Sequence, residues 1–182
     1  LAADTVYGFA VDRTMPAKQA LGPLLLSYFF DPVESDHIVK YPKRGGASVA
    51  TLAEADLDAR NIGDAPVAQT VKERVPEFEN LPVEITYTYA AKDNDDLANT
   101  QIWRRVQEVV ITRKQERFDV PLVFPDSEAR TIVEKLGAEF WCQRDKHRFT
   151  TNWKFLKVDP ADVITATANG ITKDFIVKDI QY

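Results

Sequence analysis

The sequence contains few of the residues on which redox chemistry, metal binding and nucleophilic catalysis depend. Cys142 is the only cysteine among 182 residues, which excludes an internal disulfide framework and a cysteine-based zinc site. A single cysteine inside an apolar helical pattern is usually a small core residue, and we expect this role for Cys142. The G-x-S-x-G, H-E-x-x-H, P-loop and Rossmann glycine patterns are missing. The sequence therefore predicts no catalytic, cofactor-binding or metal-binding residues, and a chain that is not an enzyme.

Long apolar runs and an excess of positive charge are missing too. The densest apolar stretch, residues 21–30, is shorter than the roughly 18 residues of a membrane span and contains Gly22 and Pro23. The formal net charge is −5, from 23 basic and 28 acidic residues, whereas a dedicated nucleic-acid-binding protein carries a basic excess. The chain begins with Leu1, and its only methionine is Met15. We expect a piece of a longer protein that has no membrane partner and meets DNA only in passing.

Regular apolar patterns predict the main elements. Residues 81–89 alternate as in a strand with one buried face, formed by Val83, Ile85, Tyr87 and Tyr89. Residues 126–145 predict a helix capped by Asp126 or Ser127, with an apolar stripe of Ala129, Ile132, Val133, Leu136 and Phe140. An earlier helix follows Pro16, with an apolar stripe of Ala17, Ala20, Leu21, Leu24, Leu25 and Tyr28. Pro23 inside that stripe predicts a kink or two shorter helices.

Shorter extended segments supply the rest of the predicted fold. They lie at residues 5–11, 33–35, 38–41, 48–52, 67–74, 118–124, 147–158, 163–167 and 173–180. Pro121 indicates an edge strand or a bulge, and Asn169-Gly170 indicates a hairpin turn. Residues 90–99 have the composition of a polar loop, and residues 101–108 fit either strand or helix. The whole pattern predicts an α+β fold, with mostly antiparallel strands in a split-barrel-like sheet and two to three helices packed on it.

We expect this fold to be divided into two lobes. The loop-like sequence IGDAP at residues 62–66 is the candidate boundary. Lobe 1–62 would contain the first strand, the kinked helix and the short strands. Lobe 63–182 would contain the helix 126–145 and the C-terminal hairpin.

Two groups of residues could be imagined as reactive centres. Cys142 and His147 are close in sequence, but a helix that ends near residue 145 puts them on different elements without a third, orienting group. Glu34, Asp36 and His37 could bind a metal ion. A polar turn between two strands is the plainer interpretation of that segment.

Two further groups of charged residues have plain interpretations as well. Asp93, Asp95 and Asp96 resemble half of a calcium loop, but the glycine and the closing glutamate are missing, so we expect a solvated loop. Basic pairs lie near aromatic residues, a combination that can hold single-stranded nucleic acid. These pairs are Arg104-Arg105 and Arg113-Lys114, near Trp103 and Phe118. Their acidic surroundings favour a solvated strand face instead.

A series of segments, in a fixed order along the chain, carries a resemblance to a known family. They are residues 7–13 (YGFAVDR), 15–17 (MPA) with the Leu24-Leu25 helix, 30–35 (FDPVES), 40–46 (KYPKRGG), 81–87 (LPVEITY), 121–123 (PLV), Trp141 and 159–164 (DPADVI). Together they resemble the putative phage tail protein family, which includes gene transfer agent host-specificity proteins and relatives of the tip attachment protein. The sequence departs from the family at Ala161, where glycine is usual.

The resemblance implies a structural protein of the virion of a long-tailed phage or prophage. Its place would be the tail tip or baseplate hub, where it would mediate virion assembly and form part of the DNA exit channel. The implied partners are the distal tail protein, the tape measure protein and further copies of the chain in a ring, commonly a trimer. Assembly would take place in the bacterial cytoplasm. The net charge of −5 suggests a lining that repels DNA, so that DNA slides past it.

Two other functions remain open at this point. The chain could be a host-surface binding module for carbohydrate or protein, which would expose an aromatic patch such as Trp103 together with Trp153. Hub proteins are also sometimes joined to peptidoglycan-cleaving domains. An enzyme of that kind would show a concave pocket with two converging acids or a bound metal.

Overall fold

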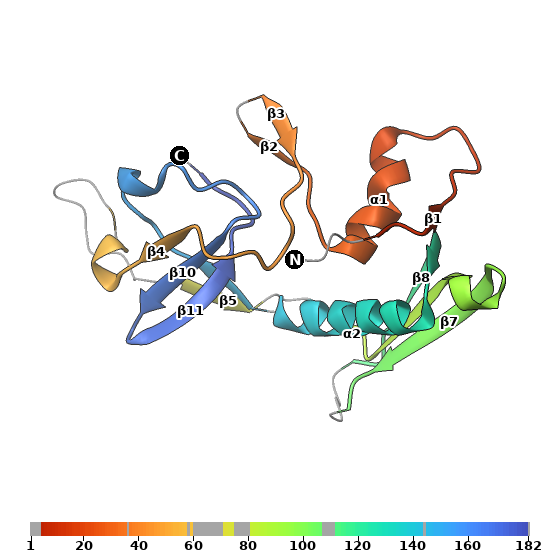
Figure 1. Cartoon of the computed structure of the whole chain (residues 1–182). Coiled ribbons are helices and arrows are strands. Elements are labelled where there is room, and N and C mark those ends of the chain that lie inside the picture. Colours follow the sequence, from red (N-terminus) through yellow and green to blue (C-terminus); the bar gives the residue numbers. More distant parts are fainter. Residues whose placement is uncertain are drawn as a thin grey trace. The chain divides into compact units, whose positions relative to one another are not determined.

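The computed structural model describes residues 5–35, 37–57, 59, 71–74, 81–106, 112–143 and 145–181. The chain forms two compact units, and each is assembled from two separate stretches of sequence (Figure 1). The first unit comprises Leu1–Tyr28 and Arg74–Asp145, and the second comprises Phe29–Glu73 and Lys146–Tyr182. The expected boundary between lobes 1–62 and 63–182 falls outside the described residues, so that division stays a prediction.

The first unit is built on a four-stranded sheet with the order β1-β8-β6-β7 (Figure 1). Its strands are β1 (Gly8–Phe9), β6 (Glu84–Ala91), β7 (Leu97–Arg104) and β8 (Gln115–Phe124). β6 and β7 pair antiparallel along their whole length. The prediction of a loop over residues 90–99 is therefore wrong except for a short turn at η3 (Lys92–Asn94). Asp95 and Asp96 complete this turn in the left-handed conformation, which their short polar side chains tolerate.

One face of this sheet is buried under two helices, α1 (Ala17–Tyr28) and α2 (Asp126–Cys142). The predicted alternation of β6 is confirmed, because its buried residues are Ile85, Tyr87, Tyr89 and Ala91. α1 packs Tyr28 against Phe124 of β8, with 5.8 Å between the ring centroids. α2 stacks Phe140 on Phe118 of β8, with 6.2 Å between the centroids. Aromatic contacts from both helices therefore reach the same strand.

Pro121 produces a bulge in β8, which confirms one of the two predicted outcomes. β8 runs parallel to β6, with Thr88 opposite Asp119 and Ala90 opposite Val123. β8 thus uses four residues where β6 uses two. Proline has no N–H to donate to a neighbouring strand, so the ladder is interrupted where Pro121 lies. The carbonyl of Pro121 instead accepts a hydrogen bond from the backbone N–H of Ala10, at 3.1 Å.

A buried polar contact fastens α1 to the sheet. α1 runs through Pro23 as one helix, so the predicted split into two shorter helices is wrong. The Ser27 hydroxyl donates to the carbonyl of Pro23 at 2.7 Å. The Tyr87 hydroxyl lies 2.7 Å from the Ser27 hydroxyl oxygen. Because serine has a single hydroxyl proton, Tyr87 is the donor of the second bond. Burial raises the pKa of Tyr87, which therefore keeps its proton.

The first backbone N–H of α2 donates to a side chain from another element. The predicted caps are wrong, because Pro125 is the N-cap and Asp126 is the first helical residue. The Asp126 carboxylate accepts hydrogen bonds from Tyr89 at 2.6 Å and from Asn99 at 3.0 Å. The backbone N–H of Asp126 donates to the carboxylate of Asp93 at 3.4 Å, so an acid from the β6–β7 turn lies at the positive end of the helix.

The second unit contains a three-stranded sheet with the order β11-β10-β4. Its strands are β4 (Ala50–Leu52), β10 (Val163–Ala168) and β11 (Ile171–Ile176). The predicted hairpin at Asn169-Gly170 is confirmed, with both residues at the positive φ angles of 51° and 72° that its turn requires. The core under this sheet consists of Leu52, Leu57, Val158, Ile164 and Ala166.

Short elements complete the second unit. They are β2 (Val33–Ser35), β3 (Ile38–Lys40), η1 (Glu54–Asp56) and η4 (Trp153–Phe155), and a further two-stranded sheet pairs β5 (Val71–Arg74) with β9 (Asp145–Arg148). The predicted strand over residues 147–158 is wrong beyond Arg148, because η4 replaces its second half. The α+β class is confirmed. Pairing is mixed, since β6–β8 and β4–β10 are parallel, and the sheets of the described residues are open.

The packing of α2 on β7 predicts the outcome of a matched pair of glycine substitutions. A Cβ atom at Gly137 of α2 would overlap the indole ring of Trp103, whereas a Cβ at Gly22 of α1 would meet nothing within 4 Å. We expect Gly137→Ala to destabilise the protein by about 1–2 kcal/mol, because overpacking outweighs the gain in helix propensity. Gly22→Ala should stabilise it by about 0.5–1 kcal/mol. Denaturant unfolding measures both, and equal effects of the two variants would show that Trp103 does not pack here.

Candidate interaction site

A two-stranded ribbon of the second unit, which we call the arm (residues 29–44), is drawn in orange in Figure 1 and carries several exposed apolar side chains. β2 and β3 pair antiparallel at its outer part, with Val33 opposite Lys40 and Ser35 opposite Ile38. The pairing continues inward through a bridge between Phe30 and Lys43. The paired region therefore extends beyond the two named strands, from Ser35 and Ile38 inward to Phe30 and Lys43.

The base of the arm is closed by a two-point ion pair. The Arg44 guanidinium donates to both carboxylate oxygens of Asp31, with N–O distances of 2.8 Å and 2.6 Å. This fork geometry is the strongest form of an arginine–carboxylate contact. Hydrogen bonding by Arg44 lowers the pKa of Asp31, against the opposing effect of partial burial. The backbone adds two bonds at the same place, from Asp31 N–H to the Pro42 carbonyl and from Arg44 N–H to the Phe29 carbonyl.

One carboxylate holds the outer part of the arm. Asp159 accepts a hydrogen bond from the hydroxyl of Ser35 at 2.7 Å. Lys40 donates to the same Ser35 oxygen at 2.8 Å, and its ammonium lies 3.5 Å from the Asp159 carboxylate. Ser35 is buried, whereas Lys40 and Asp159 are partly exposed. The three groups hold one another through two hydrogen bonds and an ion pair, and this arrangement positions the arm.

Asp159 belongs to a tight turn, residues 159–162, that is itself closed by hydrogen bonds. Its N–H donates to the Asp162 carboxylate at 2.9 Å, and its carbonyl accepts from the Asp162 N–H at 3.2 Å. The next segment pairs with the turn as well, through Ala161 N–H to the Val177 carbonyl at 2.7 Å. Ala161 has a φ of 70°, in the left-handed region that costs an L-residue with a Cβ about 1–2 kcal/mol.

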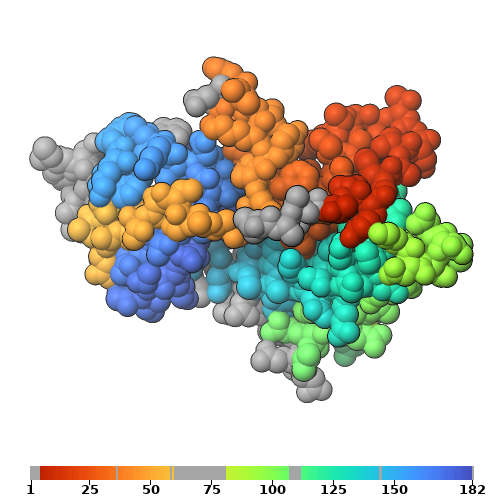
Figure 2. All heavy atoms as spheres, viewed as in Figure 1, coloured from red at the N-terminus to blue at the C-terminus, as the bar shows by residue number. Residues whose placement is uncertain are grey.

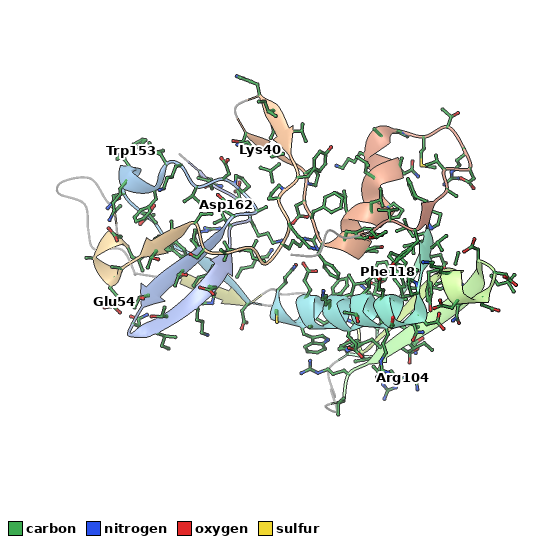
Figure 3. The ribbon with its side chains drawn as sticks, viewed as in Figure 1. Lys40, Glu54, Arg104, Phe118, Trp153 and Asp162 are labelled. Atoms are coloured by element: carbon green, nitrogen blue, oxygen red, sulfur yellow. The ribbon has the colours of Figure 1, made fainter. Side chains whose placement is uncertain are left out.

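A hollow of about 380 Å³ lies between the arm and this turn. It is lined by Val33, Lys40, Tyr41, Pro42, Asp159, Pro160 and Asp162. Figure 3 labels Lys40 on the arm and Asp162 on the turn. The lining combines apolar walls with an ion pair whose members already bind each other. The hollow therefore suits a side chain of a partner better than a reaction centre.

The arm also exposes apolar side chains to solvent. The exposed fractions of Ile38, Val39 and Tyr41 are 62%, 54% and 50%. Tyr41 packs edge-to-face on Phe30, with 6.0 Å between the ring centroids, which fixes its orientation. The arm, coloured orange, is visible at the surface in Figure 2. Consecutive exposed apolar residues on a firmly held ribbon are typical of a protein interaction site.

The structure places the residues that the sequence suggested as reactive centres on different elements. Cys142 is exposed at the end of α2, which stops at this residue rather than near 145, so the expectation of a core residue is wrong. His147 lies in the second unit, and its ring packs on Phe175 at 5.0 Å. Glu34 is on β2 and His37 is in the following turn, while Asp36 lies outside the described residues. Over the described residues, no group of three or more histidines, cysteines and acids is arranged to hold a metal ion.

The basic and aromatic residues near β7 and β8 are used within the first unit. Arg104 pairs with Glu84 directly across the sheet at 2.6 Å, and Arg105 stacks over the ring of Trp141 at 3.6 Å. Lys114 pairs with Glu116. These contacts agree with a solvated strand face, and Arg113 is exposed as well. Residues 107–111 lie outside the described part of the chain. No described helix is both long and apolar enough to cross a membrane.

Sequence reasoning missed Ser35, Lys40 and Asp159 as a group. Ser35 and Asp159 are 124 residues apart, and neither has a spacing or a neighbour that predicts their contact. In the sequence, the segments 30–35, 40–46 and 159–164 stand out only as parts of a family pattern. Their order in that pattern was the one available signal that they belong to one site.

Comparisons with known proteins agree with that pattern. A family model described as "Putative phage tail protein" matches residues 16–180. The fold is similar to a chain in the solved structure "Virion of native gene transfer agent (GTA) particle", with a TM-score of 0.76 and 19% sequence identity. That match covers 92% of this chain and 37% of the other, so the present chain spans little more than a third of its structural relative. No curated protein matches the chain.

The left-handed Ala161 predicts a stabilising substitution. Glycine adopts this conformation without strain, so we expect Ala161→Gly to raise the free energy of unfolding by about 0.5–1 kcal/mol after the entropy cost of glycine. Ala47, an exposed loop residue without a positive φ, is the matched control. Ala47→Gly should instead lower stability by about 0.5–1 kcal/mol. Thermal unfolding compares the two, and a loss of stability in Ala161→Gly would argue against the turn geometry.

The Asp31–Arg44 pair predicts a loss of stability in acid. The pKa of Asp31 is lower in the folded chain than its ordinary value of 3.8. Its contribution is therefore complete above that value and is lost as the pH falls through and below it. We expect Asp31→Asn to cost about 1–2 kcal/mol at neutral pH, and to flatten the pH dependence of stability below pH 4. Urea unfolding across this range is the measurement, with the exposed Asp12→Asn as control; parallel pH profiles for wild type and Asp31→Asn would contradict the assignment.

Proposed function

The chain belongs to the putative phage tail protein family, and from this premise we propose that it is a structural component of the tail tip or baseplate hub of a long-tailed phage. The observation that carries the proposal is the family match over residues 16–180. In this role the chain mediates virion assembly and forms part of the DNA exit channel. It is part of the virion tail after assembly in the bacterial cytoplasm, and this part of the protein has no catalytic activity.

The partners we propose are the distal tail protein, the tape measure protein and further copies of the chain in a ring, with a trimer as the expected order. The described surface supports an assembly role through the arm, whose apolar residues are exposed while its base is held by charged contacts. The net charge of −5 supports passage of DNA without tight binding, because a negative lining repels phosphates. A strongly basic channel lining in the assembled ring would argue against that last point.

One observation favours a second function, a host-surface binding module. Trp153 is 76% exposed on η4, and the neighbouring Leu156 is 49% exposed. An exposed tryptophan on a short rigid element can stack on a sugar ring or anchor a protein contact. The sequence suggested an exposed patch of Trp103 together with Trp153. Trp103 does not contribute to an exposed patch, because it is half buried and packs on α2 in the first unit. This second function is compatible with a place in the tail tip.

Mass measurement in solution tests the assembly role. The purified chain is analysed alone and then mixed with the distal tail protein and the tape measure protein of the same phage. We expect a ring of several copies, or a complex with at least one of the two proteins. The major capsid protein of that phage serves as a control that should not bind. A strict monomer without affinity for either tail protein would contradict the proposal.

A further inference from the structure

Residues 5–11, which we call the strap, run along the outer edge of β8 in the first unit (Figure 1). The strap contains β1, which pairs with β8 over two residues only, whereas β6 pairs with β7 over eight. The backbone contacts with β8 are Gly8 opposite Val123, Phe9 opposite Leu122, and the bond from Ala10 N–H to the Pro121 carbonyl. This short ladder holds the strap weakly.

The side chains of the strap bury little surface. Its four large apolar side chains are all exposed: Val6, Tyr7, Phe9 and Val11. Its polar contacts also lie at the surface, where the Tyr7 hydroxyl donates to Glu128 at 3.0 Å and the Lys92 ammonium lies 4.0 Å from the centre of the Tyr7 ring. Exposed contacts of these two kinds stabilise a segment only slightly.

The strand β8 has other contacts that keep it in the sheet. On its inner side it pairs with β6 through Val123 and Phe124. Phe124 is fully buried and its ring packs against Tyr28 of α1. A segment with a short ladder and few buried apolar contacts opens at a lower free energy than the core beside it. The strap therefore leaves β8 more readily than the rest of the unit unfolds.

The edge of β8 under the strap is selective for the strand that lies on it. A Cβ atom at Gly8 would lie 2.7 Å from Cγ2 of Val123, closer than Cβ atoms approach their neighbours. Valine has a stiff side chain, so Val123 does not simply turn aside. A strand that replaces the strap must therefore present a glycine opposite Val123, and a tyrosine before this glycine would reach Glu128 and Lys92.

This requirement selects the occupant. The dipeptide Tyr-Gly occurs once in the sequence, at residues 7–8. The strap meets every requirement of the edge, and each copy of the chain carries a strap. A second copy is therefore the occupant whose fit is known from the structure, whereas an unrelated strand with a side chain opposite Val123 would overlap it.

We propose that the strap is exchanged between copies of the chain, so that the strap of one copy lies on β8 of its neighbour. The exchanged strap makes the same contacts as it makes within its own chain, and exchange of an identical element is a low-cost route to an oligomer. This inference rests on the proposed function, because it requires further copies beside the chain.

The link between the strap and α1 allows this exchange. Residues 12–16 span up to about 17 Å when extended, which sets the reach of the strap. Within the described residues, no ion pair or side-chain hydrogen bond holds Asp12 or Arg13 of the link to the unit. In dilute solution the strap closes on its own β8, because that edge is always near. In a ring, the neighbour's edge is held at a high effective concentration as well.

A peptide supplied in trans tests the selectivity of the edge. A fluorescent peptide with the sequence of residues 5–11 is titrated into the full chain with Gly8→Ala, whose own strap overlaps Val123. We expect it to bind this variant at least about tenfold more tightly than the wild-type chain, whose own strap competes. The same peptide with the Gly8→Ala change should bind at least about tenfold more weakly. No binding, or equal binding of the two peptides, would overturn the proposal.

Mixed isotope labelling tests exchange between chains that keep Gly8. Light and heavy chains with benzoylphenylalanine in place of Phe9 are mixed in equal amounts, assembled, irradiated and digested. If the straps are exchanged, about half of the crosslinks from position 9 to β8 join a light peptide to a heavy one. The control carries the probe at Ile102 of β7, which pairs with β6 of its own chain and should give only like-labelled crosslinks to β6.

The outcomes of this labelling separate the inference from the proposed function. An assembly of several copies in which the crosslinks from position 9 to β8 join only like-labelled peptides would refute strap exchange and leave the role in the tail untouched. A chain that assembles neither with its own copies nor with tail proteins would refute the proposed function itself.

Hydrogen exchange in the isolated wild-type chain tests whether the strap opens by itself. The Ala10 amide, which donates to Pro121, should exchange at least about a hundredfold faster than the amides of β6. The unfolding temperature of the chain gives the matched global measure. Equal protection of Ala10 and β6 would mean that the strap opens only when the whole unit unfolds, which contradicts the exchange.

Discussion

The second unit depends on the carboxylate of Asp159. Through Ser35 and Lys40 it holds the arm, and through its own turn it reaches Asp162 and the start of β10. The turn also bonds to Val177 near the end of the chain. The arm and the segment around Val177 therefore both bond to the four-residue turn 159–162. The turn accepts a strained Ala161 to do so, and the strain is tolerable because hydrogen bonds on both sides fix the backbone.

The arm is held firmly at its base, and among the described residues it remains a sheet of two strands. Charged and polar contacts at Asp31, Arg44 and Ser35 determine where it lies, while its apolar residues contribute little to the core of its own unit. This division is the reverse of a usual strand, whose apolar side chains are buried. The first unit uses a similar division at Ser27 and Tyr87, where a buried polar pair fastens a helix whose apolar stripe is only half covered. In both units, polar contacts locate elements that apolar packing alone leaves underdetermined.

The sequence predicted the elements better than their contacts. The alternation of β6, the helix α2 and the Asn169-Gly170 hairpin follow from local periodicity and turn chemistry, and all three are present. Local patterns did not predict features that depend on contacts between residues far apart in the sequence. Asp93 caps α2 across 33 residues, and the aromatic segment after Arg148 turns into η4 instead of a strand. The site was out of reach for the same reason, since the partners of Asp159 lie more than a hundred residues away.

Each unit is interrupted by the other in sequence, and this affects how the protein can be made. Strand β1 and helix α1 leave the ribosome long before the other strands of their sheet, because residues 29–73 come between them and β6. Neither unit is complete until its second stretch has been synthesised, so the exposed face of α1 has to wait for β6 and β8. Such long-range closure is slow compared with local pairing. No single cut in the chain releases an intact unit, and a nascent chain is therefore vulnerable to misassembly until its last strands have formed.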